Sequence, residues 1–363
     1  METLSAPAPV DSGHRKTPRL DSLTSLRAFA ALAVFCTHLN GFLPAFHRGS
    51  RLMLQGAAGV SFFFILSGFV LAWSSRPGTS TWRFYRRRAA RIVPAYWVAC
   101  LLSFPVIVLE GGDVAARLRL ALPQFTLLQT WWPDESINFG GNGVGWSLSV
   151  EMFFYLMFPL VIVGARRLTA AAQMAAAVVL IAAEYAWDLG WWAHTQQPLE
   201  GWLLGGFAPV RLLEFSVGVL LALLVRDGRL RWIALWWALP FAAAGYVADG
   251  FAPAGLTAVP FPVVPFAVLI VAAANSDLRG SASWLRARWL LKLGEWSFAF
   301  YLLHQMVLRV LAVTSLGGQP AGVAFAVEAL VIATVLSAAL FTFVERPLDR
   351  WLRGDGTLPV TEQ

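Results

Sequence analysis

Residues 26–40 read Leu-Arg-Ala-Phe-Ala-Ala-Leu-Ala-Val-Phe-Cys-Thr-His-Leu-Asn, an apolar run typical of a membrane-spanning helix that also contains Arg27 and His38. At 100° per residue, the eleven-position spacing places these two side chains on one helix face, about 16 Å apart along the axis. Such residues are costly in a bilayer and typically mark a reaction site or an internal pathway. In the alternative, Arg27 extends to the inner interface and His38 hydrogen-bonds a neighbouring helix.

The composition extends this interpretation to the whole chain. Of the 363 residues, 58% are hydrophobic and 13% are charged, and 17 are Trp. These values are far from those of an average soluble domain. Apolar windows of about 20 residues predict ten spans, near 25–44, 56–74, 92–110, 147–165, 170–188, 207–225, 232–250, 255–274, 293–312 and 322–344. We therefore expect an all-α integral membrane protein, a bundle of about ten transmembrane helices.

The distribution of Lys and Arg predicts the orientation of this bundle. With the N-terminus inside, 21 of the 28 Lys and Arg residues fall in cytoplasmic segments and only Arg48, Arg51, Arg117 and Arg119 on the opposite face. The positive-inside rule then places both termini in the cytoplasm. We expect a multi-pass protein of the plasma or inner membrane, with a disordered leader at 1–20, a transmembrane domain at 21–350 and a tail at 351–363. The net charge of +7 follows from the same bias and indicates no nucleic-acid partner.

The fourth predicted span contains a polar stripe. Ser147, Glu151 and Tyr155 follow one another at i, i+4 and i+8, and Glu151 lies about 8 Å below the outer interface. An encounter between Glu151 and His38 is therefore possible, in which the carboxylate orients the imidazole and leaves its other nitrogen free as a base. Alternatively, Glu151 is neutral and hydrogen-bonded within the bundle.

Two further spans contain paired polar residues. Arg211 and Glu214 have the i, i+3 spacing of a mutually neutralising pair, which favours a structural role. Tyr301 and His304 are also three residues apart, and His304 lies about 16 Å from the inner interface. A second mid-membrane histidine favours a polar cavity shared with His38.

The segment Trp82-Arg-Phe-Tyr-Arg-Arg-Arg-Ala-Ala-Arg91, expected as a loop before the third span, is the strongest charge feature. Guanidinium groups suit bidentate phosphate contacts, and aromatic neighbours suit stacking on a base. Arg87, Arg88 and Arg91 are candidate contacts for a nucleotide cofactor. The alternative is an ordinary positive flank that binds lipid headgroups.

Six sequence blocks lie in a definite order along the chain. They are Arg27 with His38, Gly59-Val-Ser-Phe-Phe-Phe-Ile-Leu-Ser-Gly-Phe69, Arg88-Ala-Ala-Arg-Ile-Val-Pro-Ala-Tyr-Trp97, Trp146-Ser-Leu-Ser-Val-Glu151, Gly294-Glu-Trp-Ser-Phe-Ala-Phe-Tyr-Leu-Leu-His304 and Phe343-Val-Glu-Arg-Pro347. In this order, across residues 20–348, they resemble the acyltransferase-3 family of membrane-bound O-acyltransferases.

The resemblance implies a ten-helix bundle that transfers an acyl group, usually from cytoplasmic acyl-coenzyme A, to a hydroxyl of a sugar, lipid, cell-wall polymer or small molecule. It implies His38 as the essential histidine, Arg27 as its partner, and Arg88 with Arg91 as contacts for donor phosphates. Ser147, Glu151, Tyr301 and His304 also fall on motif positions. Because no esterase-like domain follows the bundle, we expect a glycoside, lipid or macrolide-like acceptor, in a bacterium to judge from the Ala- and Arg-rich composition.

These residues predict general-base catalysis by His38, oriented by Glu151, with Arg27 acting electrostatically. An acyl-enzyme relay is an open alternative, as is a related acyltransferase centred on His304. From another class, a transporter or flippase would use the same intramembrane polar residues. We expect no metal, because the five histidines are scattered and both cysteines fall inside spans. The sequence predicts neither the acyl length nor the oligomeric state.

Overall fold

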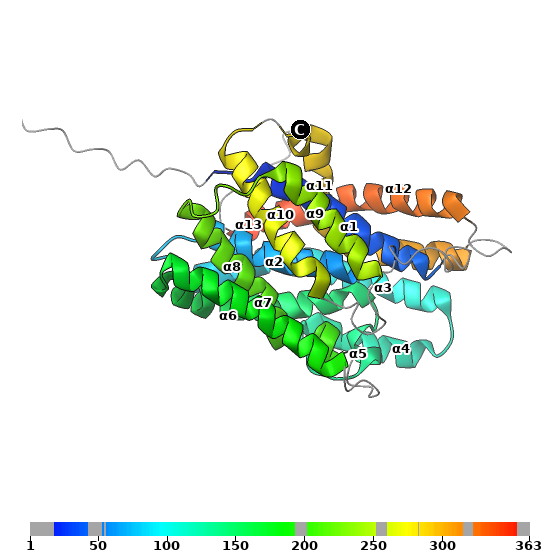
Figure 1. Ribbon diagram of the computed structural model, residues 1–363. Coiled ribbons are helices and arrows are strands. Elements are labelled where there is room, and N and C mark those ends of the chain that lie inside the picture. The colour runs from blue at the N-terminus through cyan, green and yellow to red at the C-terminus, as the bar shows by residue number, and fades with distance from the viewer. Residues whose placement is uncertain are drawn as a thin grey trace, which may run out of the picture.

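The structure is a computed structural model that describes residues 18–42, 53, 56–192, 202–251, 260–281, 283–314 and 322–353. Within these ranges the chain forms helices and no strand, and the long helices run side by side as a bundle (Figure 1). The long helices are α1 (Asp21–Asn40), α2 (Gly56–Ser74), α3 (Thr81–Glu110), α6 (Trp146–Arg167), α7 (Ala170–Trp192), α8 (Ala208–Arg226), α9 (Leu235–Gly250), α10 (Pro260–Leu278), α11 (Arg288–Thr314) and α12 (Gly322–Leu340). Three short helices are α4 (Val114–Ala121), α5 (Glu135–Asn138) and α13 (Arg346–Arg353).

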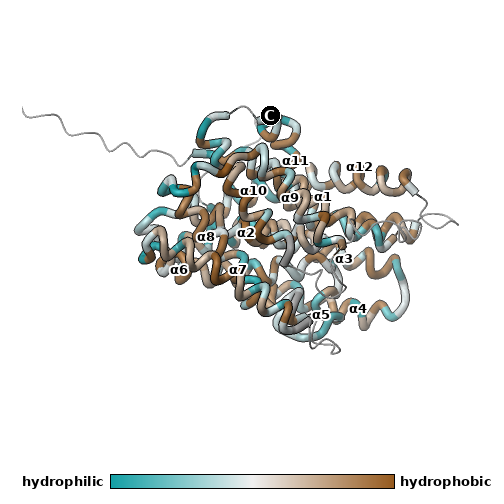
Figure 2. Tube along the Cα trace, viewed as in Figure 1, coloured by the Kyte–Doolittle hydropathy of each residue, from teal (hydrophilic) through white to brown (hydrophobic). Residues whose placement is uncertain are grey.

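The expected membrane class is confirmed. Among the described residues, seven helices are long and apolar enough to cross a membrane, and α2 and α10 contain shorter apolar helices. Hydrophobic residues dominate these helices along their length (Figure 2). Large apolar side chains such as Leu160, Trp236 and Val331 point outward, 70%, 81% and 55% exposed, as a lipid environment allows.

Three helices begin four or more residues before the predicted spans. Helix α1 begins at Asp21, four residues early, α11 at Arg288, five residues early, and α3 at Thr81, eleven residues early. The arginine-rich segment is therefore the start of α3 and not a loop. Its Phe84 ring stacks on Phe158 at 5.0 Å, so apolar packing holds this segment in the helix. Residues 1–17, 43–44, 255–259 and 354–363, which belong to the predicted leader, spans and tail, lie outside the described residues.

Glycines allow the central helices to touch backbone to backbone. A Cβ atom on Gly68 of α2 would lie 1.9 Å from the Phe215 carbonyl oxygen of α8, and one on Gly294 of α11 would lie 2.0 Å from that of Thr24 on α1. Small residues at such crossings are typical of membrane bundles. The second crossing joins α1, which carries Arg27 and His38, directly to α11.

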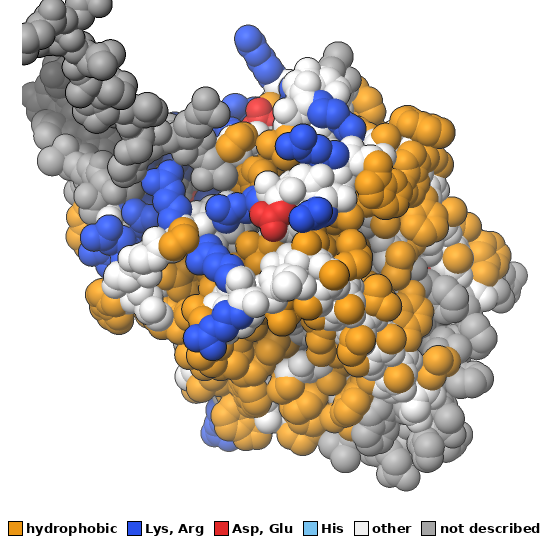
Figure 3. All heavy atoms as spheres, turned by 60° about the vertical axis from the view of Figure 1, so that its left-hand side comes forward, with side chains coloured by type: hydrophobic (Ala, Val, Ile, Leu, Met, Phe, Trp, Pro, Cys, Tyr) orange, Lys and Arg blue, Asp and Glu red, His pale blue; other side chains and the backbone are white. Residues whose placement is uncertain are grey.

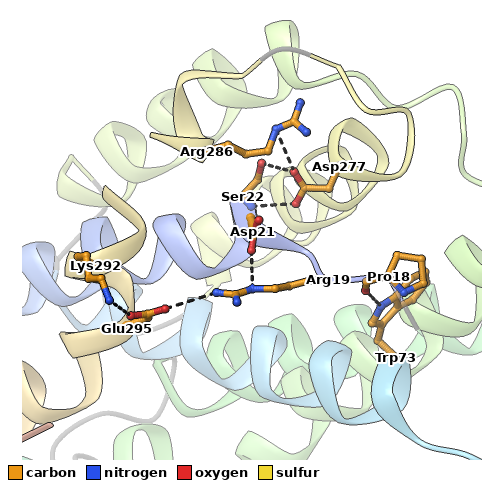
Figure 4. A network of polar contacts seen from close by, with 9 residues as sticks. All are labelled: Pro18, Arg19, Asp21, Ser22, Trp73, Asp277, Arg286, Lys292 and Glu295. Carbon is orange, nitrogen blue, oxygen red and sulfur yellow. Dashed lines mark hydrogen bonds and ion pairs between the residues drawn. The ribbon is translucent and has the colours of Figure 1, made fainter. Parts of the chain in front are cut away.

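Polar contacts fix the first turn of α1 (Figure 4). The Ser22 backbone N–H and Oγ donate to the two Asp277 carboxylate oxygens of α10 at 2.8 and 2.7 Å. Arg19 lies 3.4 Å from Glu295 of α11, which also pairs with Lys292 at 3.0 Å. These contacts fix the position of α1 along the bundle axis. We call this end of the bundle the arginine-rich end, because the arginine-bearing first turns of α3 and α11 also lie there. Figure 3 shows Lys and Arg side chains gathered at this end.

The long segment between α3 and α6 folds over the opposite end of the bundle. Gln124 and Asn142 exchange two hydrogen bonds at 3.1 Å, and Asn142 Nδ2 donates to the Leu302 carbonyl of α11 at 3.0 Å. Tyr96 of α3 donates to the Gln124 carbonyl at 3.0 Å. A polar core anchored on α3 and α11 thus holds this segment over the end of the bundle.

Candidate functional site

A pocket of about 160 Å³ lies between α1, α2, α3, α6 and α11. Most of its lining is apolar, from side chains of α2, α6 and α11. The polar lining residues include seven that the sequence analysis named and two that it did not: Arg27, Arg88, Arg91, Ser147, Glu151, Tyr155, Tyr301, Ser67 and Ser297. The structure therefore brings together residues from five helices that are far apart in sequence.

Two guanidinium groups face this pocket without an ion pair among the described residues. Neither Arg27 nor Arg88 forms a salt bridge there, and Arg88 Nε is buried without a hydrogen-bond partner. Arg91, by contrast, places Nη1 2.7 Å from Glu345 Oε1. The pocket lining holds three guanidinium groups and one carboxylate, that of Glu151, so its positive charge is only partly balanced. The pocket is therefore suited to an anionic ligand or to negative charge that develops during a reaction.

Glu151 has partners other than the one predicted for it. Its Oε1 accepts hydrogen bonds from Ser67 Oγ at 2.9 Å and from Tyr155 OH at 2.6 Å. The structure shows no hydrogen bond between Glu151 and His38, so the predicted orienting contact is not formed. The carboxylate instead lies close enough to interact electrostatically with Arg27 and Arg88.

The end of the pocket nearer the cap is closed by a contact between α6 and α11. Ser147 Oγ and Tyr301 OH lie 2.7 Å apart, and Ser147 Oγ also donates to the Val144 carbonyl at 3.1 Å. Both hydroxyl groups are buried and line the pocket. They supply hydrogen-bonding groups at the pocket wall next to the histidines.

His38 lies beside His304, beyond this wall. The centres of the two rings are 5.1 Å apart, and His304 also lies 5.9 Å from the Tyr301 ring. His304 Nδ1 is 3.1 Å from the Phe300 carbonyl, which can only accept, so Nδ1 carries the proton. In a neutral ring Nε2 is then an acceptor, and it is buried without a partner. The two histidines are therefore neighbours, although neither lines the pocket described above.

Other predicted residues lie away from the pocket. Arg87 is one position from Arg88, about 100° around α3, and does not line it. Arg211 Nη1 lies 3.3 Å from Glu214 Oε1, the pairing that the i, i+3 spacing predicts. The same Nη1 lies 4.0 Å from Glu184 of α7, which the sequence analysis did not identify.

Sequence reasoning also missed Ser67 and Glu345. Ser67 lies in the block that ends at Phe69, and Glu345 in the block Phe343–Pro347, so both were in view without a role. The structure supplies those roles: Ser67 binds Glu151, and Glu345 pairs with Arg91. Only the packing of α2 and of the segment after α12 reveals these contacts.

Comparison with known proteins agrees with this arrangement. A family model described as "Acyltransferase domain" matches residues 20–343. The acyltransferase MdmB of Streptomyces mycarofaciens is 38% identical, with 92% of each chain aligned. The exopolysaccharide production protein ExoZ of Rhizobium meliloti is 30% identical over 81% of this chain and 90% of that protein. The O-acetyltransferase OatA of Staphylococcus aureus is 26% identical over 40% of this chain and 25% of that protein. No solved structure matches the chain. With its membrane-spanning helices, the chain is an integral membrane O-acyltransferase and belongs to the acyltransferase-3 family.

Proposed function

We propose that the protein transfers an acetyl or other short acyl group from acyl-coenzyme A to a hydroxyl of a glycoside, lipid, cell-envelope sugar or macrolide-like molecule. The observation that carries this proposal is the pair of guanidinium groups, Arg27 and Arg88, that face a largely apolar pocket without ion pairs. Acyl-coenzyme A combines the two matching features, because its phosphates are anionic and its acyl chain is apolar.

The donor enters from the arginine-rich end, which faces the cytoplasm by the positive-inside rule. Arg88 lines the pocket and Arg91 lies one helical turn further along α3. The phosphates bind Arg27, Arg88 and Arg91, and the thioester extends past Tyr301 toward His38. The volume of about 160 Å³ favours a short acyl chain. The enzyme then works in the plasma or inner membrane, with both termini in the cytoplasm.

His38 acts as the general base. It takes the proton of the acceptor hydroxyl as that oxygen attacks the thioester carbonyl, and coenzyme A leaves as a thiolate that regains the proton. The His304 ring lies between Tyr301, which lines the pocket, and His38. Arg27, about 16 Å from His38 along α1, acts electrostatically on the donor phosphates. Glu151, held by Ser67 and Tyr155, balances the two guanidinium groups instead of orienting His38.

The test measures binding and consumption of radiolabelled acetyl-coenzyme A by purified protein in nanodiscs. We expect Arg88→Ala to weaken donor binding about tenfold or more, because a charge-assisted phosphate contact is lost. Arg83→Ala is the matched control, since Arg83 is an exposed arginine on the same helix that does not line the pocket. Equal donor binding by wild type and Arg88→Ala would contradict the assignment, and no donor consumption by wild type would contradict the function.

A further inference from the structure

A second pocket, of about 460 Å³, lies at the other end of α11. We call it the cap pocket, because the segment between α3 and α6 forms much of its wall. Ser297 lines the first pocket and Arg309 the second, and their spacing of twelve positions corresponds to about 18 Å of helix. His304 lies between the two. The polar side chains of the cap pocket are Glu110, Arg117, Glu135, Ser136, Gln305 and Arg309.

The charges in the cap pocket balance. Arg309 binds Glu110 through two contacts, Nε to Oε1 at 2.7 Å and Nη2 to Oε2 at 2.8 Å. Arg117 also donates to Glu110, and Glu135 provides the second carboxylate. Two carboxylates therefore face two guanidinium groups that are already engaged. In contrast to the first pocket, this one favours a neutral ligand.

The remaining groups suit a ligand rich in hydroxyls. Gln305 Oε1 is buried without a hydrogen-bond partner, so it lacks a donor that a ligand hydroxyl can supply. The Phe139 ring, 53% exposed, adds an apolar surface at the wall. A sugar presents both kinds of surface, since its hydroxyls donate and accept while its C–H face is apolar. The volume is also in the usual range for small-molecule sites.

The glycine-rich segment fixes one wall of the cap pocket against α11. Gln305 directly follows His304, and a Cβ atom on Gly143 would lie 2.8 Å from Gln305 Oε1. Gly141 has a φ of +64°, which favours glycine, and its carbonyl accepts from Arg309 Nη1 at 2.5 Å. Backbone from the glycine-rich segment thus approaches α11 where the histidine pair lies.

We propose that the cap pocket binds the sugar portion of the acceptor, so that donor and acceptor enter from opposite ends of the bundle and meet at His38 and His304. This inference rests on the proposed acyl transfer from coenzyme A. Gln305 directly follows His304 on α11, so a sugar bound at Gln305 lies within one helical turn of the histidine pair. The acyl thioester, still attached to coenzyme A, extends past Tyr301 to reach it. The sugar oxygen attacks the thioester carbonyl as His38 takes its proton, and the C–S bond breaks to release the coenzyme A thiolate.

The first test is acyl transfer from radiolabelled acetyl-coenzyme A to methyl β-D-glucoside, methyl α-D-mannoside and methyl α-L-rhamnoside, with octan-1-ol as an apolar alcohol. We expect wild type to label at least one glycoside in preference to octan-1-ol. Gln305→Met preserves side-chain volume and removes the amide, so we expect the KM for that glycoside to rise about tenfold, with the donor KM unchanged. Arg119→Ala, an exposed arginine on α4 outside the pocket, is the control.

Two results would overturn the cap pocket as the sugar site while leaving the proposed function in place. One is a glycoside KM equal to that of wild type in both Gln305→Met and Glu135→Gln, and the other is transfer of label to octan-1-ol alone. A second measurement does not depend on catalysis. Ser136→Cys places a thiol at the cap pocket, and the native Cys36 and Cys100 lie within α1 and α3. We expect the methyl glycosides to slow its reaction with a membrane-impermeant maleimide at least about threefold. No protection by any of them would contradict the inference even if wild type failed to use acetyl-coenzyme A.

Discussion

Ser67 Oγ donates a hydrogen bond to Glu151 Oε1 at 2.9 Å and so joins α2 to α6 inside the first pocket. Tyr155 donates to the same oxygen at 2.6 Å. The carboxylate is thereby fixed beside the pocket guanidinium groups, while His38 lies next to His304. Glu151 therefore contributes to the charge balance of the pocket, whereas His38 transfers the proton.

The hydrogen bond from Tyr155 to Glu151 stabilises the protein. Tyr155→Phe removes it without changing the ring, so we expect the free energy of unfolding to fall by about 1.5–3 kcal/mol, the range for a bond to a charged group. Thermal unfolding in nanodiscs checks this. Tyr85→Phe is the matched control, because Tyr85 donates to the Leu156 carbonyl at an exposed position. Equal losses in the two variants would contradict a special role for Tyr155.

The ion pair between Arg91 and Glu345 connects the donor site to the C-terminal part of the bundle. The Glu345 side chain is fully buried and that of Arg91 is 28% exposed. We expect Glu345→Ala to cost about 3 kcal/mol, because it leaves a cation without its partner. The double variant R91M/E345L replaces both charges and should recover most of that stability, measured by thermal unfolding. A double variant as unstable as Glu345→Ala would argue against the pair as the cause.

Much of the fold could be predicted because a bilayer requires long apolar helices, and such runs are visible in sequence. The start of α3 could not, because Trp82–Arg91 combines charge with aromatic residues and looks like a loop flank. Only the stacking of Phe84 on Phe158 of α6 shows why it is helical. A sequence pattern reflects the environment of the helix that carries it, whereas the start of α3 depends on packing against α6.

The candidate site divides in the same way. Helical spacing placed Ser147, Glu151 and Tyr155 on one stripe, and all three line the pocket. The hydrogen-bond partners of Glu151 could not be predicted. The sequence indicates that His38 and Glu151 lie at similar depths in the membrane, but it does not indicate which helices are in contact. Helix α1 packs on α11 with a close approach at Gly294, and His38 lies beside His304 along the same pair of helices.

That crossing provides a further prediction. Gly294→Ala would put a Cβ atom 2.0 Å from the Thr24 carbonyl, so α1 and α11 must separate. We expect a loss of about 1–3 kcal/mol in stability, as for overpacked cores, together with a large loss of acyl transfer. Gly164→Ala on α6 is the control, since nothing lies within 4 Å of the added Cβ. Wild-type transfer by Gly294→Ala would show that the position of His38 does not depend on this contact.

Asp277 fixes the first turn of α1 through two hydrogen bonds from Ser22. Asp277→Ala leaves both donors without this partner, as when a helix cap is removed. We expect a loss of about 0.5–2 kcal/mol in thermal unfolding. Asp227→Ala, at an exposed position after α8, is the comparison and should change stability by less than about 0.5 kcal/mol. A greater loss at Asp227 would contradict this account of α1.

The role of His38 as the general base is the central claim, and single-turnover transfer of labelled acetyl groups tests it most directly. Protein in nanodiscs is saturated with acetyl-coenzyme A and a glycoside acceptor, and the rate of ester formation is compared among wild type, His38→Ala and Cys36→Ala. Cys36 is the control because it lies on the same helix, about 200° away from His38. We predict a rate about 100- to 10,000-fold lower for His38→Ala with unchanged donor binding, and a near wild-type rate for Cys36→Ala. A His38→Ala rate within a few-fold of wild type would contradict the account.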